Sequence, residues 1–325
     1  MSSTVAPYRA PRWLRGGHAQ TIYPAMFLRA GRPRYRRERW DAPDGDFVDL
    51  DFLDGGPAGA PRVALFHGLE GDSSSHYAVA LMSALARARW NGVVVHFRGC
   101  SGEPNRLPRA YHSGDAAEIG WILARLAQAG GPLYAAGVSL GGNALLKWLG
   151  ESGGGARACL CAAAAVSAPL DLMASGAALG RGPNLIYTRM FLSSLRRKSL
   201  AKLARFPGLF DRGRMLAARN LRQFDDVVTA PLHGFRDTDD YWTRASSKRG
   251  LRDVRLPTLV LNAKNDPFLP ACHLPRSAEA SPMVVLEQPE EGGHVGFAAG
   301  AFPGNLEWLP QRLLAFFGEH ALALR

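Results

Sequence analysis

The chain has 325 residues, of which 47% are hydrophobic and 21% are charged. This composition is typical of a folded protein and excludes a disordered chain. Lys and Arg number 39 against 28 Asp and Glu, which gives a formal net charge of +11. The basic residues gather in two stretches, Arg29–Arg39 and Arg196–Arg222, without any nucleic-acid-reading motif. We therefore expect no nucleic-acid partner, and peripheral contact with an anionic membrane surface stays open.

Four cysteines lack the spacing of metal ligands, and they are Cys100, Cys159, Cys161 and Cys272. Such residues are typical of a reducing compartment, where thiols stay unpaired. The N-terminus shows no basic region followed by an apolar stretch and a cleavage site. No apolar run reaches the ~18–20 residues that a membrane span needs. The sequence therefore predicts a cytoplasmic protein.

Strands and helices are predicted to alternate after an N-terminal region rich in Arg, Pro and Gly. That region ends in a predicted strand, Phe47–Leu53. The next predicted strands cover residues 63–66, 92–97, 133–138 and 158–166, and the predicted helices cover 77–89, 113–129 and 143–149. Continuous apolar strands separated by helices predict a mostly parallel central sheet with helices on both faces.

The alternation stops between Pro169 and Ser246, where helical pieces with basic faces replace it. It resumes with predicted strands over 258–263 and 283–287 and a last helix over 310–324. We therefore predict an α/β core in two parts, 1–168 with an N-terminal extension 1–45, and 247–325. A helical cap insertion, 169–246, separates them.

The strongest chemical motif is G-x-S-x-G, at Gly137–Gly141. An apolar strand ends directly before it and a helix follows directly after it. Glycines on both sides relieve the crowding of such a tight turn, and the turn raises Ser139 at the N-terminus of the helix. The alternative is a glycine-rich turn whose serine only caps the helix. The context favours Ser139 as a nucleophile.

A serine needs a general base, and the order serine, acid, histidine along the chain narrows the choice. His294 lies in a glycine-rich loop after the last predicted strand, so it is the predicted base. Asp266 follows the strand 258–263 and is the predicted acid that orients the imidazole. Asp171, just after the preceding strand, is the rival acid.

The loop His67–Gly71 follows the first apolar strand of the alternating region. In this arrangement one oxyanion donor is the N–H after the nucleophile, here Leu140, and the other comes from this loop, here Leu69. His67 itself is predicted to brace the loop. Arg98 either binds an anionic part of the substrate or, as the preferred interpretation, pairs with an acid such as Asp115 or Glu118.

Motifs spread over nearly the whole chain resemble the YheT-like branch of the α/β-hydrolases, whose animal relatives include esterases and phospholipases. They are Gly17–Pro24, His67–Gly71, Phe97–Asn105, Tyr111–Gly114, the turn at Ser139, Phe224–Asp225, Asn265–Phe268 and Gly293–Gly296. The resemblance implies an α/β-hydrolase fold and places Ser139, Asp266 and His294 in a catalytic triad. It implies hydrolysis of carboxylic esters, with small-molecule or lipid-like substrates.

The expected reaction passes through an acyl-enzyme and needs no metal and no organic cofactor. The apolar and basic segment Leu185–Phe206 is predicted to be a cap helix, and Phe191, Leu192 and Leu195 are candidate substrate-binding residues. A more specific hypothesis is that this helix forms an acyl-binding wall whose basic face contacts anionic lipid surfaces. Two further readings stay open, an acyltransferase using the same triad and a non-catalytic binding protein.

Overall fold

Short apolar runs form the centre of the molecule, a sheet of eight strands with the order β1-β2-β4-β3-β5-β6-β7-β8. The computed structural model describes residues 5–31 and 33–321. The strands are β1 (Arg36–Asp41), β2 (Phe47–Leu53), β3 (Arg62–Phe66), β4 (Asn91–Val95), β5 (Leu133–Val138), β6 (Ala162–Val166), β7 (Thr258–Leu261) and β8 (Val284–Glu287). The six strands from β4 to β8 in this order are parallel to one another, and β2 is antiparallel to both of its neighbours, β1 and β4. This confirms the predicted mostly parallel sheet.

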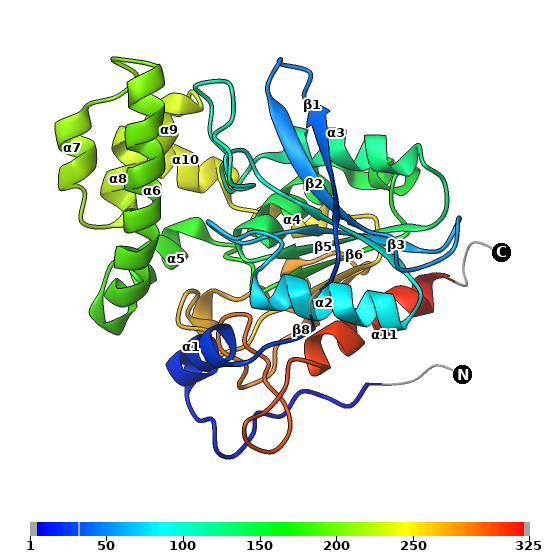
Figure 1. The fold of residues 1–325 in the computed structure, drawn as a ribbon. Coiled ribbons are helices and arrows are strands. Elements are labelled where there is room, and N and C mark those ends of the chain that lie inside the picture. The colour runs from blue at the N-terminus through cyan, green and yellow to red at the C-terminus, as the bar shows by residue number, and fades with distance from the viewer. Residues whose placement is uncertain (1–4, 32, 322–325) are drawn as a thin grey trace.

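Helices cover both faces of the sheet (Figure 1). One face packs against α3 (Ala116–Ala127) and α4 (Leu140–Ser152), and the other packs against α2 (His76–Arg87) and α11 (Trp308–Ala321). The inner strands are apolar on both sides because both faces are buried. This arrangement places the carboxyl ends of the parallel strands along one edge of the sheet, where ligands bind in open α/β folds.

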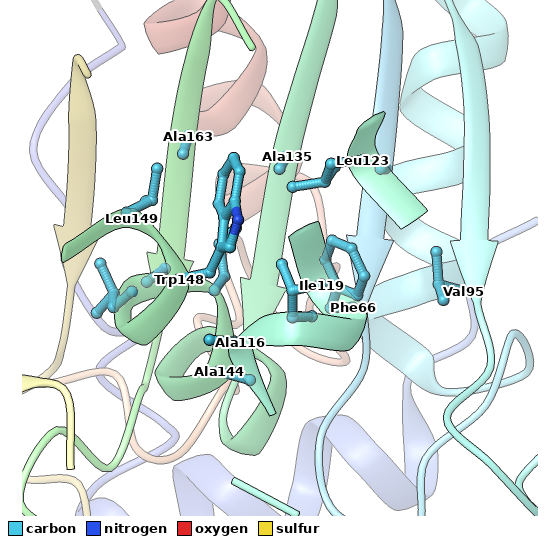
Figure 2. Packing of buried hydrophobic residues seen from close by; sticks show 14 of the residues in the cluster. Phe66, Val95, Ala116, Ile119, Leu123, Ala135, Ala144, Trp148, Leu149 and Ala163 are labelled. Carbon is cyan, nitrogen blue, oxygen red and sulfur yellow. The ribbon is translucent and has the colours of Figure 1, made fainter. Parts of the chain in front are cut away.

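Close packing on the α3 and α4 face depends on small residues as well as large ones. Figure 2 shows Trp148 of α4 against the strands that carry Ala135 and Ala163, with Ile119 of α3 beside it. A Cβ atom at Gly120 would lie 2.6 Å from the indole nitrogen of Trp148. The absence of a side chain at Gly120 therefore lets the two helices approach closely.

Between β6 and β7 the chain forms only helices, which we call the cap segment. They are α5 (Leu172–Leu179), α6 (Leu185–Arg205), α7 (Arg212–Ala217), α8 (Leu221–Val227), α9 (Thr229–Leu232) and α10 (Thr238–Ala245). Leu192, Met215 and Phe224 belong to a separate apolar cluster inside this segment. Short 3₁₀ turns occupy 153–158, 182–184, 248–252, 271–273 and 277–279.

Several predicted boundaries differ from the observed ones. The N-terminal region contains a helix, α1 (Gly17–Phe27), and the edge strand β1, neither of which was predicted. Residues 158–161 are not part of a strand, because pairing between β5 and β6 begins at Tyr134 and Ala162. Residues 322–324 of the predicted last helix lie outside the described residues. Within the described ranges, no helix is long and apolar enough to cross a membrane.

Candidate active site

The turn after β5 has the strained backbone that its sequence predicts. Ser139 has φ 51° and ψ −121°, a conformation that is costly for a residue with a side chain. A Cβ at Gly137 would lie 2.5 Å from the carbonyl oxygen of Gly141, and a Cβ at Gly141 would lie 2.4 Å from that of Phe66. Only glycine fits at either position. The two glycines of the G-x-S-x-G pattern are therefore required by the same tight turn that strains Ser139.

His294 and Asp266 come to this turn from loops far along the chain. The Nε2 atom of His294 lies 3.0 Å from Ser139 Oγ, and its Nδ1 atom lies 2.8 Å from Asp266 Oδ2. The Asp266 side chain is buried and also accepts a hydrogen bond of 2.7 Å from the Phe268 N–H. The structure therefore brings the three residues together in one line. Asp171, the rival acid, instead caps α5 through Ala174 N–H and faces His273.

The imidazole of His294 is fixed from its ring face and from its backbone. The ring of Phe268 stacks on it with 3.9 Å between centroids. The His294 N–H donates to Thr21 Oγ1 at 2.8 Å, and the next N–H, of Val295, donates to Ser167 Oγ at 3.0 Å. Because the ring is stacked and two backbone N–H groups of its loop are hydrogen-bonded, the imidazole has little freedom to move away from Ser139.

Two backbone N–H groups beside Ser139 remain available for an anion. In the loop after β3, Gly68 donates to the Tyr77 hydroxyl and Glu70 donates to the Tyr111 hydroxyl, both at 2.9 Å. Leu69 lies between them, and its N–H has no acceptor among the described residues. The Leu140 N–H is at the start of α4, where the first amides have no intrahelical partner. Both leucines line the cavity at Ser139.

His67 braces the loop His67–Gly71, which carries the Leu69 N–H and which we call the oxyanion-side loop. His67 does not act as a base. Its Nε2 atom accepts from the Phe97 N–H at 3.1 Å, so Nδ1 carries the proton and donates to the Gly68 carbonyl at 2.7 Å. Complete burial lowers the pKa of His67 to about 3. The ring is therefore neutral, and its two hydrogen bonds hold the loop against β4.

Ser139 opens into a cavity of about 600 Å³ between the core and the cap segment. The wall is mainly apolar near the serine and becomes basic along α6. Phe191 and Leu195 line it, as two of the three predicted pocket residues. Leu192 does not line the cavity, and this prediction is corrected. Leu192 follows Phe191 in α6 and therefore faces another side of the helix. Its side chain packs in the apolar cluster of the cap segment and is 2% exposed.

Glu70 connects the oxyanion-side loop to the cap segment. Lys198 of α6 places Nζ 2.9 Å from Glu70 Oε1, and Ser194 of α6 donates to Oε2. The Tyr111 hydroxyl donates to Oε1 at 2.8 Å. Burial lowers the pKa of Lys198, but the neighbouring Cys100 and Glu70 outweigh burial and hold that pKa above its ordinary value. Sequence reasoning missed this contact because 128 residues separate the partners.

Three of the six basic side chains of α6, those of Lys198, Lys202 and Arg205, bind the core. Lys202 Nζ donates to Asn105 Oδ1 and to the Leu107 and Arg109 carbonyls, at 2.9–3.0 Å. Arg205 donates to the Asn105 carbonyl at 2.7 Å. The hypothesis that this face meets anionic lipid is therefore wrong for these residues, since their donors are already used.

Two arginines at the end of the first basic stretch, and Arg98, are likewise structural. Arg37 and Arg39 form two-point ion pairs with Asp51 and Asp49 of β2. Arg98 is buried among three carboxylates, those of Asp44, Asp46 and Glu118. Glu118 was one of the two predicted partners of Arg98, and the other, Asp115, pairs with Arg109. The structural interpretation of Arg98 is therefore supported.

Asp225 of α8 is another acid that lines the cavity. Its carboxylate accepts from Trp242 Nε1 at 2.8 Å and from Thr229 Oγ1 at 2.6 Å, so it fastens α8 to α10. Burial raises its pKa to about 6, since no basic side chain pairs with it among the described residues. The Phe224–Asp225 motif pointed to this position but not to its contacts.

Comparisons with known proteins identify the family of this chain. A family model described as the alpha/beta hydrolase fold matches residues 61–301. The candidate esterase YheT of Escherichia coli (strain K12) is 39% identical over 96% of this chain and 93% of its own. The phospholipase ABHD3 of Mus musculus is 30% identical over 91% of this chain and 74% of its own. The chain belongs to the α/β-hydrolase family, in its YheT-like branch.

A solved structure shows the same fold at low identity. The esterase Pf2001 of Pyrococcus furiosus superimposes with a TM-score of 0.54 and 14% identity, over 89% of this chain and 92% of its own. With the matched family model and these relatives, the protein is a hydrolase of the α/β-hydrolase fold.

Proposed function

We propose that the protein is a serine esterase in which Ser139, His294 and Asp266 form the catalytic triad. The observation that carries the proposal is the continuous hydrogen-bonded line from Ser139 Oγ through both ring nitrogens of His294 to Asp266 Oδ2. The strained turn holds the hydroxyl at the cavity, and the Leu69 and Leu140 N–H groups stand beside it. No cofactor takes part.

The mechanism follows from these positions. His294 takes the Ser139 proton as the hydroxyl attacks the ester carbonyl, while Asp266 accepts the Nδ1–H bond and stabilises the imidazolium. The N–H groups of Leu69 and Leu140 bind the oxyanion of the tetrahedral intermediate. His294 then protonates the leaving alcohol, and a water molecule repeats the cycle on the acyl-enzyme. Fluorophosphonate labelling of Ser139, argued below, tests this proposal.

The substrate is proposed to be a small or lipid-like ester whose acyl part lies along Phe191, Leu195 and Phe268. Phe191 and Leu195 line the cavity from α6, and Phe268 lines it from the loop after β7. The family resemblance to esterases and a phospholipase supports an ester with an apolar chain. The cytoplasmic location stays a prediction.

Replacement of Lys198 by Met is expected to lower kcat about tenfold with a smaller change in KM. The substitution leaves the nearly buried Glu70 carboxylate without its cation, which loosens the loop that carries the Leu69 donor. Steady-state kinetics with a soluble ester measures the effect, and Lys198→Arg should restore part of it.

Lys147→Met is the control for this prediction because it removes the partly exposed pair with Glu151 in α4. A surface pair of this kind contributes little to stability. Equal kinetic effects of Lys198→Met and Lys147→Met would contradict the link between the cap segment and the oxyanion donor.

We further propose that a lipid surface contacts the start of α6 together with α1. The two helices touch through His18 Nδ1 and the Tyr187 hydroxyl, 3.1 Å apart. We define the α1/α6 surface by its exposed apolar side chains, which are Met26, Phe27, Ile186, Met190 and Phe302. Residues 1–35 and 172–197 contain no Asp or Glu, and Arg29, Arg181 and Arg189 form no ion pair within the described residues, so this surface carries positive charge. Apolar side chains on a basic surface favour an anionic bilayer.

Vesicle flotation tests this contact. We expect binding to vesicles with anionic lipid, weakening as salt rises, and little binding to zwitterionic vesicles. The double substitution Phe27→Ser and Met190→Ser should reduce binding about fivefold or more. The matched control is Met283→Ser with Val285→Ser, two exposed apolar residues at β8. Binding that ignores lipid charge, or that falls equally in both double variants, would overturn the assignment of this surface.

A further inference from the structure

The N-terminal motif Gly17–Pro24 has no place in the mechanism above, yet one of its side chains is among the most buried polar groups. Gln20 of α1 is 1% exposed. Burial of an amide is costly unless all its hydrogen bonds are made. The partners of Gln20 therefore show what the motif does.

Three of the four hydrogen bonds of the Gln20 amide go to the loops that carry Asp266 and His294. Its Oε1 atom accepts from the Gly292 N–H at 2.9 Å and from Asn265 Nδ2 at 2.8 Å. Its Nε2 atom donates to the Leu14 carbonyl at 2.8 Å and to Glu291 Oε1 at 3.1 Å. One side chain thus joins the loop after β7 to the loop after β8.

These partners flank the proposed acid and base directly. Asn265 precedes Asp266, and Gly292 lies two residues before His294. Asn265 Oδ1 also accepts from the Gly293 N–H at 2.9 Å, which closes a ring of bonds between the two loops. Thr21, next to Gln20, accepts the His294 N–H at 2.8 Å.

The backbone of α1 also touches both loops. A Cβ at Gly17 would lie 1.9 Å from the Asn265 carbonyl oxygen, and a Cβ at Gly296 would lie 1.7 Å from that of Gln20. Neither position accepts a side chain without movement of the backbone. The helix and the two loops are therefore packed as one unit, with the Gln20 amide at its centre.

We propose that Gln20 is a positioning residue for the hydrolytic reaction, which holds the Asp266 loop and the His294 loop at the spacing that the imidazole–carboxylate bond requires. This inference rests on the triad proposed above. Gln20 does not touch the reacting atoms. It acts through Asn265 and Gly292, so its removal should change turnover more than substrate binding.

The test is Gln20→Met, which keeps the length of the side chain and removes its hydrogen bonds. We expect kcat for a soluble ester to fall about 10- to 100-fold, since small displacements of catalytic groups have effects of this size. KM should change less than about threefold. In addition, the far-downfield proton resonance expected of the His294–Asp266 bond should weaken or disappear. A purely structural residue would leave that resonance and kcat in the folded fraction unchanged.

A variant at a distant buried amide serves as the control. Asn91→Ala removes a buried amide at the opposite, amino end of β4. It should lower the melting temperature while kcat and the downfield resonance stay native.

The outcomes separate this inference from the triad itself. If Gln20→Met does not fold, the nearly isosteric Thr21→Val, which removes the acceptor for the His294 N–H, should give the same loss of kcat at little changed KM. Native kcat and a native downfield resonance in the folded variants would overturn the positioning role of Gln20. Labelling of Ser139 in the unaltered protein would in that case still support the triad. Failure of Ser139 to label would instead overturn the proposed function.

Discussion

Ser139→Ala is expected to lower kcat for ester hydrolysis roughly 10⁶-fold, the size of effect seen when the nucleophile of a serine hydrolase is removed. The physical reason is that His294 Nε2, 3.0 Å from Ser139 Oγ, then has no hydroxyl to activate. The oxyanion donors and the cavity remain, so a small residual rate above that in water is expected. Folding should be retained, and the melting temperature should stay the same or rise, because alanine is smaller in the strained turn.

A fluorophosphonate probe makes the test specific to one hydroxyl. The unaltered protein should be labelled at Ser139, and Ser139→Ala should not be labelled at all. Ser175 provides a matched control because it lines the same cavity but has no histidine beside it, and its hydroxyl is unbonded within the described residues. Ser175→Ala should therefore label as the unaltered protein does. Labelling that persists in Ser139→Ala, or ester hydrolysis at the native rate, would remove the nucleophile from the proposal.

The parts of the site that could be predicted are those fixed by local sterics and chain order. The glycines around Ser139 are needed because neighbouring carbonyl oxygens lie within 2.5 Å of where their Cβ atoms would be. Asp266 and His294 follow strands that end at the same edge of the sheet, so parallel pairing brings them together. The structure places the His294 ring and the Asp266 carboxylate at hydrogen-bonding distance.

The parts that could not be predicted depend on contacts between distant segments. Helix α6 carries apolar residues on more than one face, so Leu192 could not be distinguished from Phe191 and Leu195 until the helix was packed against α7 and α8. The basic residues of α6 resembled a solvated face, but Lys198 and Lys202 reach acceptors about 100 residues away or more. Helix α1 contains a proline and begins with a glycine, which hid it among the other Pro-rich and Gly-rich residues.

Asp266→Asn is expected to lower kcat about 10⁴-fold while leaving the fold intact. The asparagine can still accept the Phe268 N–H at Oδ1, but its amide group now faces His294 Nδ1 as a donor. The imidazole therefore adopts the tautomer with its proton on Nε2, which points at Ser139 and can no longer remove the hydroxyl proton. A substitution that changes one atom thus acts on the tautomer and not on the packing. Circular dichroism and thermal unfolding should be close to native.

Asp171→Asn is the decisive partner of that variant, because Asp171 is the other acid that chain order allows. In the structure it caps α5 by accepting the Ala174 N–H at 3.0 Å, a role that asparagine fulfils equally well. We expect kcat and stability within about twofold of native for Asp171→Asn. If instead this variant loses turnover and Asp266→Asn keeps it, the carboxylate that orients His294 during the reaction is Asp171. The 2.8 Å contact between His294 and Asp266 would then belong to a resting conformation. In that case the cap segment and the loop after β6 must move before catalysis to bring Asp171 to His294.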